Sequence, residues 1–522
     1  MAQTIPAKSE TAEIISRDPT TGEEIGRAPL TMPEEVARAV GRAREAQPAW
    51  AATSFDDRAR VIMKARRIIL KELDQIAVLI SRETGKPVAE AISMELTPSL
   101  DLMQYFARNT SSLLLPQQIR IGLYGLMGRS SYLINKPLGV VGIISPWNFP
   151  WATPIDEVVM ALMAGNAVVL KPSELTPLTA LKIKSVLAQA GLADGLLQVV
   201  TGDGSTGAAL IGAGPDKIMF TGSVATGKRV AEAAANYLIP VVLELGGKDP
   251  MVVLDDANIE NAARGAVWGA FANAGQACAA VERCYVHESI ADKFIKAVVA
   301  ETKRLRQSGD RQGDLGSMTS EQQLRTVERH VYEATARGAT ALTGGERVPD
   351  VPGPFFPPTI LTNVDHDMEV MREETFGPVL PIMTFKSDDE AVRLANDSAF
   401  GLTASVWTSN IARGRQLAER IDAGTVMVNE VLYTHGIAQT PWGGVKQSGF
   451  GRTHGRAGLL ELVSQQHIHV NRFASTPDVW WFSYTADARR LFRDLAKRFA
   501  SGSVFQTALL LPQMIRRLKE RR

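Results

Sequence analysis

The 522-residue chain has little cysteine and no long apolar run. Cys278 and Cys284 are its only thiols, and no segment reaches the roughly 18 apolar residues of a membrane-spanning helix. Two thiols exclude a small disulfide-rich module and indicate a reducing compartment. The amino-terminal segment MAQTIPAKSE lacks the charged and then apolar pattern of a secretory signal. These absences predict a cytoplasmic protein.

An excess of charge of either sign is also missing, because 57 Lys and Arg side chains balance 56 Asp and Glu to give a net charge of +1. Nothing in this total calls for a nucleic-acid partner. The balance is uneven, however. Residues 489–522 carry ten basic and two acidic side chains, a net +8, which leaves −7 for the first 488 residues. The length predicts two or three domains.

Short apolar runs alternate with helical stretches between Val140 and Gly247. The runs are VVGIIS, AVVLKP, LLQVVT, KIMFTG and VVLELG. Continuous β-branched runs of this kind predict strands buried on both faces, and hence a parallel, doubly wound sheet. Such sheets bind ligands at the carboxyl ends of their strands.

A second α/β alternation covers residues 251–445 and includes the strand-like ERCYVH at 282–287, so we expect two α/β domains facing a cleft. The alternating pattern of residues 119–134 predicts a β-hairpin. The segment VSQQHIHVNR at 463–472 reads as one more strand, which could pair with that hairpin.

Cys278 lies in FANAGQACAA, a turn of small residues after an apolar helix at 262–271. Small neighbours let a ligand approach, and a turn leaves the sulfur reachable. The alternative is an inert core thiol, which fits Cys284 in its strand better.

Two further polar residues sit beside predicted strands. Glu244 ends the run VVLE, where burial would raise its pKa enough for it to take a proton from water. The alternative is a glutamate that lies on an exposed face or pairs with Lys248. Asn148, in SPWNFPW, could donate to an oxyanion or simply stabilise a turn.

The signal for phosphate binding is weaker. Gly222 and Gly227 in FTGSVATGK flank a helix start whose free N–H groups could accept phosphate, but the pattern is not the G-x-G-x-x-G fingerprint. Lys171 and Glu174, in KPSE after another strand, suit ribose hydroxyls, or belong to an ordinary solvated loop.

The order and spacing of seven motifs nevertheless resemble those of the aldehyde dehydrogenase superfamily. The motifs are SPWNFP, KPSE, FTGSVATG, LELGGK, NAGQAC, EETFGPV and PWGGVKQSGFGR, and the resemblance covers about residues 15–471. It implies that Cys278 is the nucleophile, that Glu244 is the general base, and that Asn148 and the Cys278 N–H hold the oxyanion. It also implies a set of cofactor-binding residues: Trp147, Lys171, Glu174, Gly222, Ser223, Gly227, Glu374 and Phe376.

The fold implied by the resemblance is α/β, with a Rossmann-like NAD-binding domain at 1–118 and 137–246 and an α/β catalytic domain at 247–445. A small β bridging element, at 119–136 and 446–472, would join subunits into a homodimer or homotetramer. Residues 473–522 form a basic amphipathic C-terminal extension outside the resemblance.

The reaction implied is oxidation of an aldehyde to the acid through a cysteine thiohemiacetal and thioester, with NAD as cofactor, NADP as a second option, and no metal. Glu244 favours hydrolysis over acyl transfer to coenzyme A. An acylating enzyme and a non-catalytic protein on the same fold are the alternatives.

The substrate is open between two classes. Asp156 is unusual in the helix that lines the family's entrance. Met160, Leu432 and Tyr433 would suit long-chain or other hydrophobic aldehydes, whereas succinate semialdehyde would need a cationic partner such as Arg283 or His435.

The C-terminal extension carries one apolar helical face, made of Ala488, Leu491, Phe492, Leu495 and Phe499, with basic residues largely opposite. Aromatic residues at 480–482 precede it. This pattern predicts either peripheral contact with anionic lipid or docking on the enzyme's own body or a partner subunit.

Overall fold

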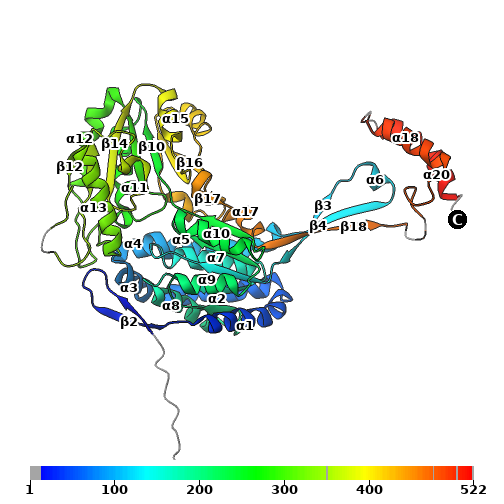
Figure 1. Cartoon of the computed structure of the whole chain (residues 1–522), viewed down its shortest axis with the longest axis horizontal. Helices are drawn as coiled ribbons and strands as arrows, with labels where there is room; N and C mark the ends of the chain where they lie inside the picture. Colours follow the sequence, from blue (N-terminus) through cyan, green and yellow to red (C-terminus); the bar gives the residue numbers. More distant parts are fainter. Residues whose placement is uncertain are drawn as a thin grey trace, which may run out of the picture. The chain divides into compact units, whose positions relative to one another are not determined.

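The structure is a computed structural model, and it describes residues 13–348, 351–473, 475, 477–500, 502 and 504–519 (Figure 1). Its residues separate into two compact units, one of Met1–Leu113 with Pro137–Ser464 and one of Leu114–Lys136 with Gln465–Arg522. The expected α/β class is confirmed.

The first unit contains a six-stranded sheet in the order β17-β9-β8-β5-β6-β7. The five predicted apolar runs form its parallel strands, which are β5 (Val140–Ile144), β6 (Ala167–Lys171), β7 (Leu197–Val199), β8 (Lys217–Thr221) and β9 (Val241–Glu244). Their side chains are almost all buried. The doubly wound arrangement brings the carboxyl ends of β5, β6 and β8 to one edge.

Amphipathic helices accompany this sheet. They are α1 (Pro33–Ala51), α2 (Phe55–Lys71), α3 (Leu73–Thr84), α5 (Thr97–Leu113), α7 (Ala152–Met163), α8 (Pro177–Gln189), α9 (Gly204–Gly212) and α10 (Val224–Ala235). Helix α2 begins at a capping box of Ser54 and Asp57 and buries Ile62, Ala65 and Ile69. A short helix α4 (Val88–Glu90), a π-helical turn (Ala91–Leu96) and the hairpin of β1 (Glu13–Arg17) and β2 (Glu24–Pro29) complete this half.

The same unit holds a seven-stranded sheet in the order β12-β13-β14-β11-β10-β15-β16. Its strands are β10 (Asp249–Val253), β11 (Val281–His287), β12 (Thr340–Thr343), β13 (Thr359–Thr362), β14 (Val379–Phe385), β15 (Thr403–Trp407) and β16 (Thr425–Val428). Only β12 runs antiparallel among these described strands. The accompanying helices are α11 (Ile259–Phe271), α12 (Ala291–Thr302), α13 (Glu321–Ala336), α14 (Glu369–Arg372), α15 (Asp388–Asn396) and α16 (Ile411–Ala418). Helix α17 (Gly455–Leu460) instead packs against α5, beside the six-stranded sheet.

The position of one strand disagrees with the domain boundary that was expected at residue 446. Strand β17 (Gly449–Phe450) pairs antiparallel with β9 and extends the six-stranded sheet. Gly449 has φ +110°, and a Cβ there would lie 1.9 Å from the Leu243 carbonyl oxygen, so only glycine permits this approach. Residues 446–462 therefore belong with the first unit.

The second unit is built on a three-stranded sheet in the order β18-β4-β3. Strand β3 (Gln117–Ile119) pairs antiparallel with β4 (Arg129–Pro137), with the short helix α6 (Leu123–Leu126) between them, as the predicted hairpin requires. The last expected strand, β18 (Val463–Asn471), lies against β4.

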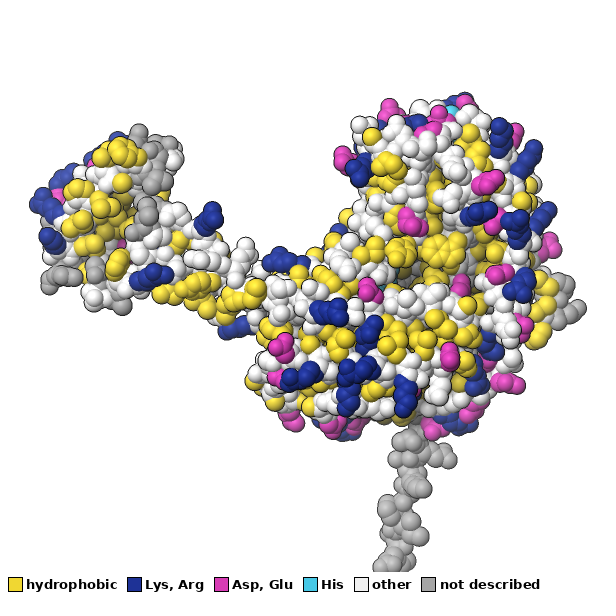
Figure 2. Space-filling view, turned by 180° about the vertical axis from the view of Figure 1, so that it is seen from behind, with side chains coloured by type: hydrophobic (Ala, Val, Ile, Leu, Met, Phe, Trp, Pro, Cys, Tyr) yellow, Lys and Arg dark blue, Asp and Glu magenta, His cyan; other side chains and the backbone are white. Residues whose placement is uncertain are grey.

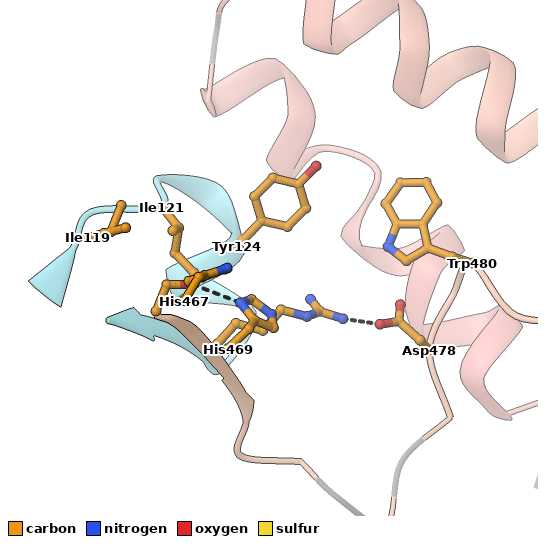
Figure 3. A pocket seen from close by; sticks show the side chains of 9 residues that line it. Ile119, Ile121, Tyr124, His467, His469, Asp478 and Trp480 are labelled. Carbon is orange, nitrogen blue, oxygen red and sulfur yellow. Dashed lines mark hydrogen bonds and ion pairs between the residues drawn. The ribbon is translucent and has the colours of Figure 1, made fainter. Parts of the chain in front are cut away.

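The C-terminal extension folds into α18 (Ala486–Ala500), α19 (Val504–Ala508) and α20 (Leu511–Lys519). Figure 3 shows how its first residues meet the sheet: Asp478 pairs with Arg129, and Trp480 faces Tyr124 across a pocket of about 410 Å³. No helix among the residues that the structure describes is long and apolar enough to cross a membrane.

Candidate active site

A cavity in the first unit has a volume of about 800 Å³, and it brings together Cys278, Glu244 and Asn148. These residues lie far apart in the sequence and come from different segments: Asn148 follows β5, Glu244 ends β9, and Cys278 lies between α11 and β11. The cavity therefore unites a thiol, a carboxyl group and a side-chain amide.

A run of left-handed residues positions Cys278. After α11, Asn273 and Ala274 both have φ +53° and Gly275 has φ +72°. A Cβ on Gly275 would lie 2.1 Å from the Gly377 carbonyl oxygen, so a side chain is excluded there. The turn leaves Cys278 partly exposed at the cavity, whereas Cys284 is buried in β11, as expected for an inert thiol. Burial, together with the negative charges of Asp249, Glu374 and Glu244, raises the pKa of the Cys278 thiol.

Asn148 is held from both sides. Its backbone carbonyl accepts hydrogen bonds from Lys86 Nζ at 2.7 Å and from Asn273 Nδ2 at 3.0 Å. Its own Nδ2 donates to the Gln276 carbonyl oxygen at 3.0 Å, two residues before Cys278. Because a side-chain amide nitrogen carries two N–H groups, one donor remains for a ligand beside the sulfur.

Glu244 is 5% exposed, and neither of its carboxyl oxygens has a hydrogen-bond partner among the described residues. Burial, reinforced by the negative charge of Glu157, raises its pKa well above the usual range, while Arg452 acts in the opposite direction. The alternative partner for Glu244, Lys248, instead binds Glu282 at 2.6 Å. Glu244 is thus a buried carboxyl group open to the cavity.

Sequence reasoning missed Glu157, which lines the same cavity from α7. Burial and the neighbouring Asp156 raise its pKa to about 8. The signal in the sequence was the pair of acidic residues in PIDEVVMALM. Because the rest of that segment is apolar, a helix formed by it would be buried, and both acidic side chains would be buried with it.

One side of the cavity carries Trp147, Gly222, Ser223, Glu374 and Phe376. The rings of Trp147 and Phe376 meet edge to face at 5.5 Å. Gly247 N–H donates to Glu374 Oε1 at 3.1 Å, and a Cβ on Gly246 would lie 2.2 Å from Glu374 Oε2, so glycine makes room for this carboxyl group.

The other expected cofactor residues lie outside the cavity lining. Gly227 is in α10, where a Cβ would lie 2.5 Å from the Leu245 side chain, and Ser223 caps the start of that helix. Lys171 ends β6 and contacts Glu174 at 3.5 Å. A helix N-terminus for phosphate and carboxylates for ribose hydroxyls are the groups that a nicotinamide dinucleotide requires, so this set fits one.

The remaining wall is largely apolar. Met160, Leu432 and Tyr433 all line the cavity, together with Met94, Phe149, Trp268 and Trp442. Arg283, proposed as a partner for a substrate carboxylate, lies elsewhere. It is 1% exposed, and its guanidinium donates to the carbonyls of Lys248, Leu394 and Ala395. The prediction that Arg283 binds a substrate carboxylate is wrong, because backbone carbonyls already accept the hydrogen bonds of its guanidinium.

His435 does line the cavity, but burial lowers its pKa to about 4, so it is neutral at neutral pH. Among the lining residues that the structure describes there is no lysine or arginine. The cavity therefore presents no fixed positive charge.

Comparisons with known proteins agree across most of the chain. The model of the aldehyde dehydrogenase family matches residues 5–468. The chain is 39% identical over 480 residues to the 4,4'-diapolycopene aldehyde oxidase of a Methylomonas species, covering 92% of this chain and 90% of the relative. It is 40% identical over 455 residues to a protein of Mycolicibacterium smegmatis named "Putative succinate-semialdehyde dehydrogenase (NADP⁺)", covering 87% of each.

A solved structure, the NAD-dependent aldehyde dehydrogenase of Sinorhizobium meliloti, superposes with a TM-score of 0.86 at 37% identity and covers 90% of this chain and 93% of that one. The NAD⁺ complex of a Bacillus cereus aldehyde dehydrogenase superposes with a TM-score of 0.84 at 33% identity, covering 88% and 94%.

Proposed function

Because the chain belongs to the aldehyde dehydrogenase family, and is thus an NAD(P)-dependent oxidoreductase that acts on aldehydes, we propose that Cys278, Glu244 and Asn148 carry out the reaction. The observation that supports these roles is their convergence on one cavity of about 800 Å³. A nucleophile, a base and an oxyanion donor are the three groups that this chemistry needs.

In the first step the Cys278 thiol releases its proton to water, the thiolate attacks the aldehyde carbon, and the carbonyl oxygen becomes an oxyanion. The second N–H of Asn148 Nδ2 donates to that oxygen, while its first N–H stays on the Gln276 carbonyl. This fixed donor needs no reorganisation when the charge develops.

Bound nicotinamide dinucleotide would accept the hydride that leaves the former aldehyde carbon when the oxyanion becomes a carbonyl group again and the Cys278 adduct becomes a thioester. Glu374 and Glu174 would hold ribose hydroxyls, and Ser223 with the α10 N-terminus would hold the pyrophosphate. Trp147 and Phe376 would enclose the space beside Cys278 and exclude water.

In the second half-reaction Glu244 removes a proton from water, which attacks the thioester carbon; the C–S bond breaks and the acid leaves. A carboxylate with a raised pKa is a stronger base than an ordinary one, which suits this step. Such a base favours hydrolysis over acyl transfer to coenzyme A.

The substrate class that we propose is a hydrophobic, long-chain or polyene aldehyde. The described lining carries Met160, Leu432, Tyr433 and further aromatic residues but no lysine or arginine, so a second carboxylate on the substrate would be desolvated without a partner. Similarity to a relative named for diapolycopene aldehyde agrees with this assignment.

A panel of aldehydes tests the proposal, with formation of the reduced cofactor as the signal and kcat/KM as the measure. We expect long alkanals and polyene aldehydes to exceed succinate semialdehyde by at least about tenfold, since each 1.4 kcal/mol of preference gives tenfold. The Cys278→Ala variant should lose all turnover, and the matched Cys284→Ala variant should keep it. Preference for succinate semialdehyde would overturn the substrate class.

The C-terminal extension gives a second, separate part of the proposal, peripheral contact with anionic lipid. The centre of the apolar face of α18 does not supply this contact, because Leu491 and Leu495 pack against Val479, Leu510 and Met514 of the extension itself, whereas Phe499 at its end is 40% exposed. Arg517 also donates to the carbonyls of Val479 and Trp481.

A different apolar set remains at the surface of this unit, where Figure 2 shows apolar and basic side chains side by side. It comprises Trp481, Phe482, Tyr484, Phe505, Leu509, Leu511 and Ile515, with exposures between 45% and 80%. Exposed Arg489, Arg490, Arg493, Lys497 and Lys519 supply positive charge. Aromatic residues beside basic ones suit the interface of an anionic bilayer.

Co-sedimentation with vesicles tests this contact on the full chain. We expect the wild-type protein to pellet with phosphatidylglycerol vesicles and less with phosphatidylcholine vesicles, and the Phe505→Ser/Leu509→Ser variant to pellet less with both. The control is Leu238→Ser, which removes a 91% exposed leucine from the first unit. Equal pelleting of all three proteins would contradict lipid contact.

We also propose a homodimer or homotetramer joined through the three-stranded sheet. Strand β18 is mostly exposed and lies at an edge of that sheet, and an unprotected edge readily pairs with another chain. Sedimentation velocity of the purified chain is expected to give a dimer or tetramer, and a monomer would exclude the proposal.

A further inference from the structure

Three side chains from separate segments converge on the cavity wall without a role in the proposed reaction. Asp156 comes from α7, His435 from the turn Tyr433–Gly436, and His454 from the residue before α17. One possible ligand atom of each lies within 4.8 Å of the others. His454 Nε2 is 3.6 Å from Asp156 Oδ2, and the two imidazole rings are 4.8 Å apart.

Two polar atoms of this cluster lack a hydrogen-bond partner in the part of the chain that the structure describes, namely Asp156 Oδ1 and His454 Nε2. Both side chains are only 3% exposed. A buried carboxylate without a cation and a buried ring nitrogen without a partner are each costly. A cation bound between them would satisfy both atoms at once.

The two imidazoles are prepared to act as ligands. Thr453 Oγ1 lies 3.0 Å from His454 Nδ1, so the hydroxyl oxygen can accept a hydrogen bond from Nδ1–H, the tautomer that leaves the Nε2 lone pair free. The rings of His435 and Trp442 pack edge to face, with their centroids 4.9 Å apart.

We propose that Asp156, His435 and His454 bind a divalent transition-metal ion of the zinc class. Two imidazoles and one carboxylate suit Zn²⁺, Co²⁺ or Fe²⁺, whereas Mg²⁺ and Ca²⁺ prefer oxygen ligands throughout. In a tetrahedral site with bonds of about 2.0 Å, ligand atoms lie roughly 3.3 Å apart, so closure needs movements of about 1 Å or less.

Three protein ligands leave one coordination position, and it faces the cavity because all three residues line it. Water would complete the tetrahedron. Metal binding can be measured directly, so its test does not depend on turnover.

The experiment titrates Zn²⁺ into chelator-treated full-length protein against a chromogenic chelator, and repeats the titration with Co²⁺ to record its visible absorption. Because Cys278 is a soft ligand in the same cavity, both titrations are run in the Cys278→Ala protein. We expect one site per chain and a tetrahedral Co²⁺ spectrum. His435→Gln and His454→Gln should each weaken binding by at least about 100-fold, since loss of an outer-shell partner alone costs 10- to 100-fold.

Controls separate this site from others. His287→Gln changes a histidine outside the cluster, and His467→Gln/His469→Gln removes the pair in the second unit; both proteins should bind as before. Dinucleotide binding, followed by fluorescence, checks that each variant is folded. Loss of the site in Cys278→Ala, unchanged affinity in His435→Gln, or no binding at micromolar Zn²⁺ would each overturn the proposal.

Discussion

Lys86 and Glu95 form a fully buried ion pair, with Nζ 2.6 Å from Oε1 and side chains 1% and 0% exposed. Lys86 also donates to the Asn148 carbonyl oxygen and lies over the Phe149 ring. Glu95 accepts from the backbone N–H groups of Trp151 and Ala152. The pair thus fixes both ends of the loop at residues 148–152, which carries the proposed oxyanion donor Asn148.

Replacing Lys86 by Met should be costly, because it leaves Glu95 as an uncompensated buried charge. We expect the free energy of unfolding to fall by about 3–5 kcal/mol, the usual cost of breaking a buried pair. Loss of the donor to Asn148 should also lower kcat. Urea unfolding and steady-state kinetics measure the two effects.

The matched control is Lys182→Met, which breaks the pair of Lys182 and Glu72 at 2.5 Å with side chains 25% and 22% exposed. A more exposed ion pair contributes about 0–1 kcal/mol to the free energy of unfolding, so this variant should lose no more than that. Equal losses in the two variants would show that burial is not what makes the Lys86 pair important.

The Glu244→Gln variant should separate the two half-reactions. An amide cannot take the proton from water, so the thioester should accumulate and kcat should fall by about 10²–10⁴-fold. Stopped-flow mixing is expected to give a burst of one reduced cofactor per chain, followed by slow turnover. If the first turnover slows as much as kcat, Glu244 acts before the thioester forms.

The Glu157→Gln variant should change the pH dependence of kcat by changing the pKa of Glu244. Burial and the negative charge of Glu157 both raise the pKa of Glu244, so removing that charge lowers this pKa. The base then becomes deprotonated at lower pH, and the rising limb of the kcat profile should move to lower pH. The control, Asp101→Asn, removes another carboxylate from the cavity lining and should leave the limb in place. A shift to higher pH would contradict this coupling.

The sequence predicted the elements whose signals are local. The five parallel strands of the first sheet were evident because β-branched runs such as that of β5 are continuous. The turn of Cys278 was evident from its small residues. Strand β17, by contrast, has two residues, and its pairing depends on the positive φ of Gly449 rather than on any apolar pattern.

Groups that meet only in the folded chain were not predictable. Asp156, His435 and His454 are distant in sequence, and no spacing rule joins them. Arg283 was one candidate for the cationic partner that succinate semialdehyde would need, yet its guanidinium binds backbone carbonyls instead. Likewise, the apolar face of α18 was correctly located, but its centre is covered by the extension itself.

Cofactor choice should depend on Glu174, which is 50% exposed and lies 3.5 Å from Lys171 Nζ. A carboxylate accepts from a ribose 2'-hydroxyl but repels a 2'-phosphate. In Glu174→Gln the repulsion is lost while Lys171 remains to attract the phosphate. The ratio of kcat/KM for NADP to that for NAD should therefore rise, by about tenfold if the change is near 1.4 kcal/mol. Glu232→Gln, which removes an exposed carboxylate from α10, should leave the ratio unchanged. An unchanged ratio in Glu174→Gln would mean that Glu174 does not contact the adenosine ribose.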